Sequence, residues 1–153
     1  MKQIASFSVD HDKIRPGMYI SRIDGDVTSF DLRTRTPNAG DYMDNITMHS
    51  VEHMLATFLR NGEIGESVIY FGPMGCRTGF YLLLAGDYTS KDVVPLVKDC
   101  FAFIADFTGE IYGASPVDCG NYLDMNLPMA KFWAKRYAAL LANIDETRLH
   151  YPK

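Results

Sequence analysis

DNITMHSVEHMLATFLRNG, residues 44–62, carries the clearest helical pattern in this chain. Its apolar residues recur at the three- and four-residue intervals of an amphipathic helix. Asp44 or Asn45 can cap the start, because a side-chain oxygen there accepts hydrogen bonds from the free N–H groups of the first turn. Asn61-Gly62 can end the helix. The segment therefore predicts one well-delimited helix that packs an apolar face against a core.

Three polar side chains gather on one arc of this predicted helix. At 100° per residue, His53 lies about 40° from His49, and Glu52 lies about 60° to the other side. The apolar residues occupy a separate arc: Val51, Leu55, Phe58 and Leu59. Two histidines four residues apart can reach one metal ion, and the neighbouring carboxylate can act as a general base. Surface histidines are the ordinary alternative, but two of only four histidines share this turn, which favours a metal site.

The segments on either side predict an α+β fold. Strands are expected before the helix at 4–9, 18–23 and 27–33, and after it at 66–71 and 80–85. Two further helices are expected, one from Ser90 to Phe107 and one starting near Pro128. This order, with tight links between neighbouring strands, favours a mainly antiparallel sheet packed on one face by helices.

Composition limits the class of protein. With 153 residues, 47% hydrophobic and 22% charged, the chain resembles one ordinary globular domain, 1–153. A net charge of −4 argues against a nucleic-acid partner. No signal peptide or membrane-spanning run is recognisable, so we expect a cytoplasmic protein without a membrane partner. Three cysteines in such a chain are expected to be free thiols or metal ligands.

The third ligand of a divalent metal site has several candidates. Cys100 lies in a predicted helix beside aromatic residues and is interpreted as a core residue. Cys76 and Cys119 each lie in an irregular, glycine-flanked turn, so either thiol can ligate, and simple packing is the alternative for both. Two imidazoles and a thiolate suit Zn²⁺ or Fe²⁺. The other cysteine is then available for acid–base chemistry, and Arg77 beside Cys76 would favour a thiolate there.

Five ordered sequence blocks resemble those of S-ribosylhomocysteine lyases, the LuxS family. They are SFSVDH at 6–11, FDLR at 30–33, HSVEH at 49–53, PMGCRTGFYL at 73–82 and DCGNY at 118–122. The resemblance covers essentially the whole chain. Together the blocks are far more specific than the H-x-x-E-H pattern alone.

The resemblance implies roles for individual residues. His49, His53 and Cys119 match the three metal ligands, and the ion is expected to be Fe²⁺, one per subunit, with Zn²⁺ or Co²⁺ as substitutes. Glu52 and Cys76 match the paired acid–base groups. The family is homodimeric with its sites at the subunit interface, so the same assembly is expected here.

Three further residues match substrate contacts that assist proton transfer: Ser6, His11 and Arg33. One position departs from the family pattern. Tyr70 stands where some members carry an aspartate six residues before the reactive cysteine. The tyrosine hydroxyl is the candidate replacement for that carboxylate.

The reaction implied by the resemblance breaks the thioether of S-ribosylhomocysteine. Homocysteine and 4,5-dihydroxy-2,3-pentanedione, the precursor of autoinducer-2, are the expected products. Migration of the sugar carbonyl from C1 to C3 would make the C4 hydrogen acidic and permit β-elimination, with the metal polarising each carbonyl. Two alternatives remain from the residues alone: a small H-x-x-E-H metallopeptidase, and a metal-binding module without catalysis.

Overall fold

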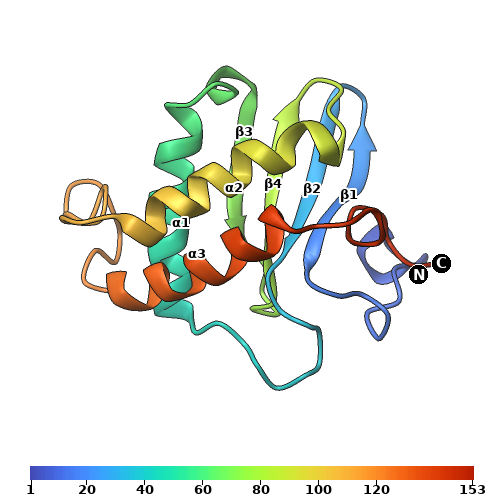
Figure 1. The fold of residues 1–153 in the computed structure, drawn as a ribbon, viewed down its shortest axis with the longest axis horizontal. Helices are drawn as coiled ribbons and strands as arrows, with labels where there is room; N and C mark the ends of the chain where they lie inside the picture. The colour runs from blue at the N-terminus through green and yellow to red at the C-terminus, as the bar shows by residue number, and fades with distance from the viewer.

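Four antiparallel strands form the central sheet, and the computed structural model describes all residues, 1–153 (Figure 1). The strands are β1 (Gly17–Asp24), β2 (Val27–Arg33), β3 (Val68–Pro73) and β4 (Gly79–Ala85). Their order across the sheet is β1-β2-β4-β3, and every neighbouring pair is antiparallel. Three α-helices complete the fold: α1 (Asn45–Arg60), α2 (Ser90–Asp106) and α3 (Leu127–Ala142). The predicted α+β class with an antiparallel sheet is confirmed.

The side chains of β4 alternate between the two faces of the sheet. Phe80, Leu82 and Leu84 are fully buried, and Phe30 of β2 pairs with Leu82 on the same face. One hydrophobic cluster of 27 buried residues joins this face to all three helices. The helices α2 and α3 cross it in Figure 1. Tyr81 points to the opposite face, because successive strand residues alternate, and Asp31 of β2, its partner in the register, points the same way.

The helix α1 forms where the sequence predicts it. The Asp44 carboxylate caps its start by accepting a hydrogen bond from the backbone N–H of Thr47 at 2.7 Å, and Asn61 is the C-cap. Its fully buried apolar residues belong to the core cluster: Val51, Met54 and Leu55. The helix packs along β3, so the arc that carries the histidines is held beside the sheet.

The two later helices also begin at predicted signals. Thr89 and Asp92 form a capping box at the start of α2. Pro95 lies inside α2, which nevertheless continues as one helix to Asp106. Asn126 caps α3, and Pro128 lies in its first turn. None of the three helices combines the length and apolar content needed to cross a membrane.

The predicted first strand, residues 4–9, is wrong. This segment contains a short 3₁₀ helix, Ala5–Phe7, in which the N–H of Phe7 donates to the carbonyl of Ile4. No strand of the sheet pairs with it, and both Ile4 and Phe7 are exposed. The weak alternation offers no apolar face that the sheet can cover, so local turn hydrogen bonds prevail.

The strand β3 begins later than predicted. The first two residues of the expected strand, 66–71, belong to a 3₁₀ helix, Gly65–Ser67. Just after Val68, β3 shifts its register against β4, as in a β-bulge. At this irregular point the guanidinium of Arg60 donates to the carbonyl oxygens of Val68 and Ile69 at 3.1 and 3.0 Å. The end of α1 is thereby attached to the start of β3.

The central position of β4 yields a stability prediction. Leu82→Ala should lower the free energy of unfolding by about 2–5 kcal/mol, because a fully buried leucine leaves both lost apolar contact and a cavity. Chemical denaturation monitored by circular dichroism measures the change. The control is Val117→Ala, at a valine that is 93% exposed, with an expected change within about 0.5 kcal/mol. Equal losses in both variants would contradict this description of the core.

Candidate active site

Two imidazoles and one thiol converge at the side of α1. The ligand atoms of His49, His53 and Cys119 all lie within 4.8 Å of one another, and the Cys119 Sγ is 3.5 Å from the His49 Nε2. Zinc–nitrogen and zinc–sulfur bonds of normal length in a tetrahedral site hold nitrogen and sulfur about 3.6 Å apart. The observed sulfur–nitrogen distance fits one ion between these atoms.

Each histidine is oriented by a hydrogen bond to its other ring nitrogen. His49 Nδ1 lies 3.0 Å from the backbone oxygen of Asp124 and 3.2 Å from the Oδ2 of the same residue. His53 Nδ1 lies 2.8 Å from the backbone oxygen of Tyr112. A carbonyl oxygen can only accept, so Nδ1 carries the proton in each ring. Both Nε2 atoms are left with a free lone pair, which is the tautomer that a metal requires.

The connection between α2 and α3 supplies the rest of this arrangement. The backbone N–H of Asn121 donates to the Cys119 Sγ at 3.4 Å. Gly113 has a φ of +71°, and a Cβ at this position would lie 3.2 Å from His53 Nδ1. The backbone thus approaches the ring closely, in a conformation that favours glycine. Gly120, beside the cysteine, has open space around it.

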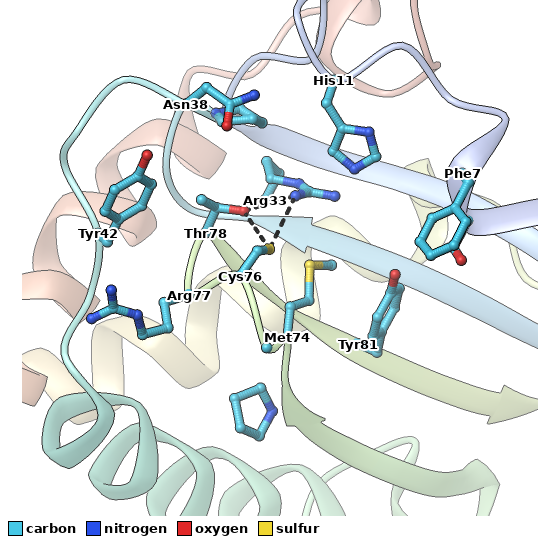
Figure 2. Close-up of a pocket in the computed structure, with 14 residues that line it drawn as sticks. Phe7, His11, Arg33, Asn38, Tyr42, Met74, Cys76, Arg77, Thr78 and Tyr81 are labelled. Carbon is cyan, nitrogen blue, oxygen red and sulfur yellow. Dashed lines mark hydrogen bonds between the residues drawn. The ribbon is translucent and has the colours of Figure 1, made fainter.

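Cys76 lines a cavity of about 750 Å³ that does not include His49, His53 or Cys119. The β3–β4 turn carries the cysteine, the end of β2 contributes Arg33, and the N-terminal segment contributes Ser6 and His11. Figure 2 shows Cys76 facing Arg33 and Thr78, with His11 above them. The structure therefore brings together four of the predicted site residues in one cavity.

The cation that approaches the Cys76 thiol is Arg33. Its Nη1 lies 4.0 Å from the Cys76 Sγ and donates to the Thr78 Oγ1 at 2.8 Å. The Thr78 hydroxyl oxygen is 3.1 Å from the same sulfur. Because that oxygen accepts from Arg33, its own hydrogen is free to be donated to a thiolate. The Cys76 sulfur thus has a guanidinium and a hydroxyl group directly beside it.

The sequence pointed to Arg77 for this role, and the structure differs. Arg77 has a φ of +63° in the tight turn after Cys76. Its guanidinium lies 5.7 Å from the ring centroid of Tyr42, and it extends away from the sulfur in Figure 2. The turn thus directs Arg77, the neighbour of Cys76 in the sequence, away from the sulfur. Arg33, 43 positions away, supplies the positive charge.

Arg33 is itself held by a buried carboxylate. Asp31 accepts from Arg33 Nη2 at 2.6 Å and from Nε at 3.1 Å, in a bidentate pair. Both side chains are buried, on the sheet face away from the helices. Residues two apart in a strand share a face, so this pair was detectable in the FDLR block. The contribution of Thr78 had no comparable signal.

Glu52 opens into a different cavity from Cys76. It lines a smaller cavity of about 300 Å³ together with His49. The two cavities share the segment 73–75 as a common wall. The acid–base pair expected from the sequence is therefore divided within one chain.

Tyr70 lies outside both cavities. It is 48% exposed on β3, and its hydroxyl lies so close to Gly72 that a Cβ there would overlap it. Gly72 therefore makes room for the tyrosine side chain. The expected replacement of a carboxylate by this hydroxyl stays a prediction.

Comparison with known proteins identifies the family. The S-ribosylhomocysteinase (LuxS) family profile matches residues 4–148. The chain belongs to the LuxS family. S-ribosylhomocysteine lyase of Clostridium acetobutylicum is 58% identical, with both chains covered completely. The enzymes of the same name from Clostridium beijerinckii and Finegoldia magna are 53% and 51% identical, with at least 99% of each chain covered. The resemblance drawn from the motifs is confirmed, and the LuxS chain is of the carbon–sulfur lyase class.

The close approach at Gly113 generates a prediction for this LuxS chain. Gly113→Ala should weaken Zn²⁺ binding about tenfold, because the added methyl group displaces the His53 ring and strains the backbone. Competition with a chromogenic chelator measures the affinity. Gly120→Ala, which adds the same atom in open space next to Cys119, should change it less than about twofold. Equal weakening in both variants would contradict the inference that the close approach of Gly113 holds the His53 ring in place.

Proposed function

We propose that this chain is an S-ribosylhomocysteine lyase that releases homocysteine and 4,5-dihydroxy-2,3-pentanedione, the autoinducer-2 precursor. One observation carries the proposal: a two-imidazole, one-thiol cluster lies beside a cavity in which a cysteine faces a buried arginine. Membership in the LuxS family and 58% identity to a lyase of this name support the assignment of S-ribosylhomocysteine as the substrate. Three free cysteines and a net charge of −4 fit a cytoplasmic enzyme acting on a small molecule.

The proposed metal ligands are His49, His53 and Cys119. The donor set of two imidazoles and one thiolate suits Fe²⁺ or Zn²⁺. We assign Fe²⁺, one per subunit, with Zn²⁺ or Co²⁺ as substitutes. When bound, such an ion supplies Lewis-acid polarisation of the sugar carbonyls. The chain's own residues hold the ligand rings in the required tautomer through Tyr112 and Asp124.

Cys76 and Glu52 are the proposed proton carriers. The thioether carbon is C5, and its bond breaks by β-elimination once the carbonyl lies at C3, since the C4 hydrogen is then acidic. Each migration of the carbonyl needs a proton removed from one carbon and returned to the next. We assign these transfers to Cys76, whose sulfur lies beside Arg33 and Thr78, and the elimination to Glu52. A positioned acid or base of this kind contributes about 10²–10⁴-fold to the rate.

Ser6, His11 and Arg33 are the proposed substrate contacts. All three line the cavity that contains Cys76. His11 Nδ1 lies 2.9 Å from the backbone oxygen of Val9 and donates to it, so Nε2 can accept a hydrogen bond from a sugar hydroxyl. Arg33 lines this cavity beside the thiol.

A homodimer with its sites at the interface is part of the proposal. Within one chain, Cys76 and Glu52 open into separate cavities that share only the wall at 73–75. A second copy of the chain can complete each cavity with the missing group. Exposed apolar side chains suitable for burial by that copy are Ile4, Phe7, Ile69 and Tyr70.

The central test measures thiol release. Anaerobically purified protein with S-ribosylhomocysteine should release homocysteine, detected with a thiol reagent. Cys76→Ala should reduce turnover by at least about 10²-fold while metal content is unchanged, because the proton carrier is lost. Cys100→Ala removes a buried thiol in α2 and should leave turnover near the wild-type value. Near-normal turnover in Cys76→Ala would remove this residue from the mechanism.

The same assay separates the rival functions. A metallopeptidase would cleave peptides and release no thiol from S-ribosylhomocysteine. A metal-binding module would retain the ion and release none either. Metal analysis of the same sample shows whether an inactive preparation has merely lost its ion.

Mixing two inactive variants tests the shared site. Cys76→Ala and Glu52→Gln should each be inactive alone. If each site combines Cys76 of one subunit with Glu52 of the other, mixed dimers contain one intact site. Random subunit exchange should then restore about a quarter of wild-type turnover. No recovery, with exchange verified by mass spectrometry of the dimers, would assign both groups to the same subunit.

A further inference from the structure

The buried carboxylate of Asp31 has a third hydrogen-bond donor besides the two N–H groups of Arg33. The hydroxyl of Tyr151 lies 2.7 Å from Asp31 Oδ2, the same oxygen that accepts from Arg33 Nη2. Asp31 is completely buried. A polar group buried away from water is stabilised by hydrogen bonds from the protein. Tyr151 supplies the third such bond to the carboxylate that holds Arg33.

Tyr151 reaches this position from the opposite end of the sequence. It is the third residue from the end of the sequence, and its ring stacks on Tyr19 of β1 with centroids 4.9 Å apart. The tail before it is held to the segment that precedes β1, since Arg148 donates to the carbonyl of Pro16 at 2.9 Å. The last residue of the tail, Lys153, accepts a hydrogen bond from the Lys13 side chain at its backbone oxygen. Both termini accordingly end beside β1 in Figure 1.

The phenol can only act as a donor to Asp31. A carboxylate accepts hydrogen bonds and does not give them. Burial, and next the negative charge of Asp31, raise the pKa of the Tyr151 hydroxyl, so it keeps its proton throughout the physiological range. The hydrogen bond therefore has one direction at neutral pH, from the Tyr151 hydroxyl to the Asp31 carboxylate.

The chain of contacts continues from Asp31 to the reactive cysteine. Arg33 is held at Nε and Nη2 by Asp31, and its Nη1 faces the Cys76 sulfur at 4.0 Å. A guanidinium is planar and rigid, so the orientation of one edge determines where the opposite edge lies. A small rotation of the Asp31 carboxylate would therefore move the Arg33 guanidinium relative to the Cys76 thiol.

We propose that Tyr151 is a positioning residue for this active site, which orients Asp31, and through it Arg33, toward Cys76. The proposal rests on the role given above to Cys76 in the lyase reaction. A purely structural function, fastening the C-terminal tail to β1, would be served equally by the stacked ring without its hydroxyl. The hydroxyl is what links the tail to the site.

The test compares Tyr151→Phe with Tyr19→Phe. Both variants keep the stacked pair of rings and lose one hydroxyl, but the Tyr19 hydroxyl donates to the backbone oxygen of Arg15, at 2.7 Å, and not to Asp31. Alkylation of each cysteine by iodoacetamide is followed by peptide mass spectrometry on the metal-loaded protein at neutral pH. The rate at Cys76 reports its thiolate character without any need for turnover.

Cys100 is an internal monitor of the fold in the same experiment. It is buried in α2, and burial raises the pKa of its thiol to about 12, so it stays unlabelled while the protein is folded. In Tyr151→Phe, alkylation of Cys76 should slow about fivefold, the size expected for one lost hydrogen bond, with Cys100 still unlabelled. In turnover, kcat should fall by a similar factor while KM changes less than about twofold. Tyr19→Phe should match the wild type in both measurements.

Three outcomes would overturn the proposal. The first is a wild-type alkylation rate at Cys76 in Tyr151→Phe, even if turnover falls. The second is an equal slowing in Tyr19→Phe, and the third is simultaneous labelling of Cys100, which would mean that the substitution merely loosens the fold. Slowed alkylation in a protein that never releases homocysteine would support the positioning of Cys76 while refuting the proposed lyase function.

Discussion

The antiparallel pairing of β2 with β4 is the constraint on which both the core and the site depend. In this register Leu32 lies opposite Phe80, on the face that packs against the helices. The next pair, Arg33 opposite Gly79, brings the guanidinium to the turn that carries Cys76. A Cβ at Gly79 would lie 2.5 Å from the carbonyl oxygen of Leu32, so glycine permits this close pairing. A shift of one residue would exchange the face that packs in the core with the face that carries Asp31 and Arg33.

The cluster of His49, His53 and Cys119 depends on hydrogen bonds between a regular helix, α1, and the irregular connection between α2 and α3. His49 and His53 use one ring nitrogen each to hold the segment between α2 and α3, at Asp124 and Tyr112. The same bonds leave the other ring nitrogens facing Cys119. The two histidines are thus both anchors of the loop and candidate ligands. Their loss would affect the arrangement of the loop as well as the binding of an ion.

The elements with strong local signals were predicted well from the sequence. Asp44 and Asn61 delimit α1 as expected, and the histidine arc follows from the helical period. The choice between Cys76 and Cys119 was left open by the residues themselves, because a connection without periodicity gives no indication of where a thiol lies. Only the family resemblance singled out Cys119. The bond between Tyr151 and Asp31 joins residues 120 positions apart, and no local pattern encodes it.

The irregular start of β3 has a consequence for colloidal behaviour. As the last strand in the sheet order, β3 would present a row of unsatisfied backbone groups to any other chain with a free edge. The bulge after Val68 bends that row, and Arg60 already occupies the carbonyls of Val68 and Ile69 while adding a positive charge beside them. Edge-to-edge association into extended aggregates is thereby disfavoured at this border of the sheet, at the cost of a single side chain from α1.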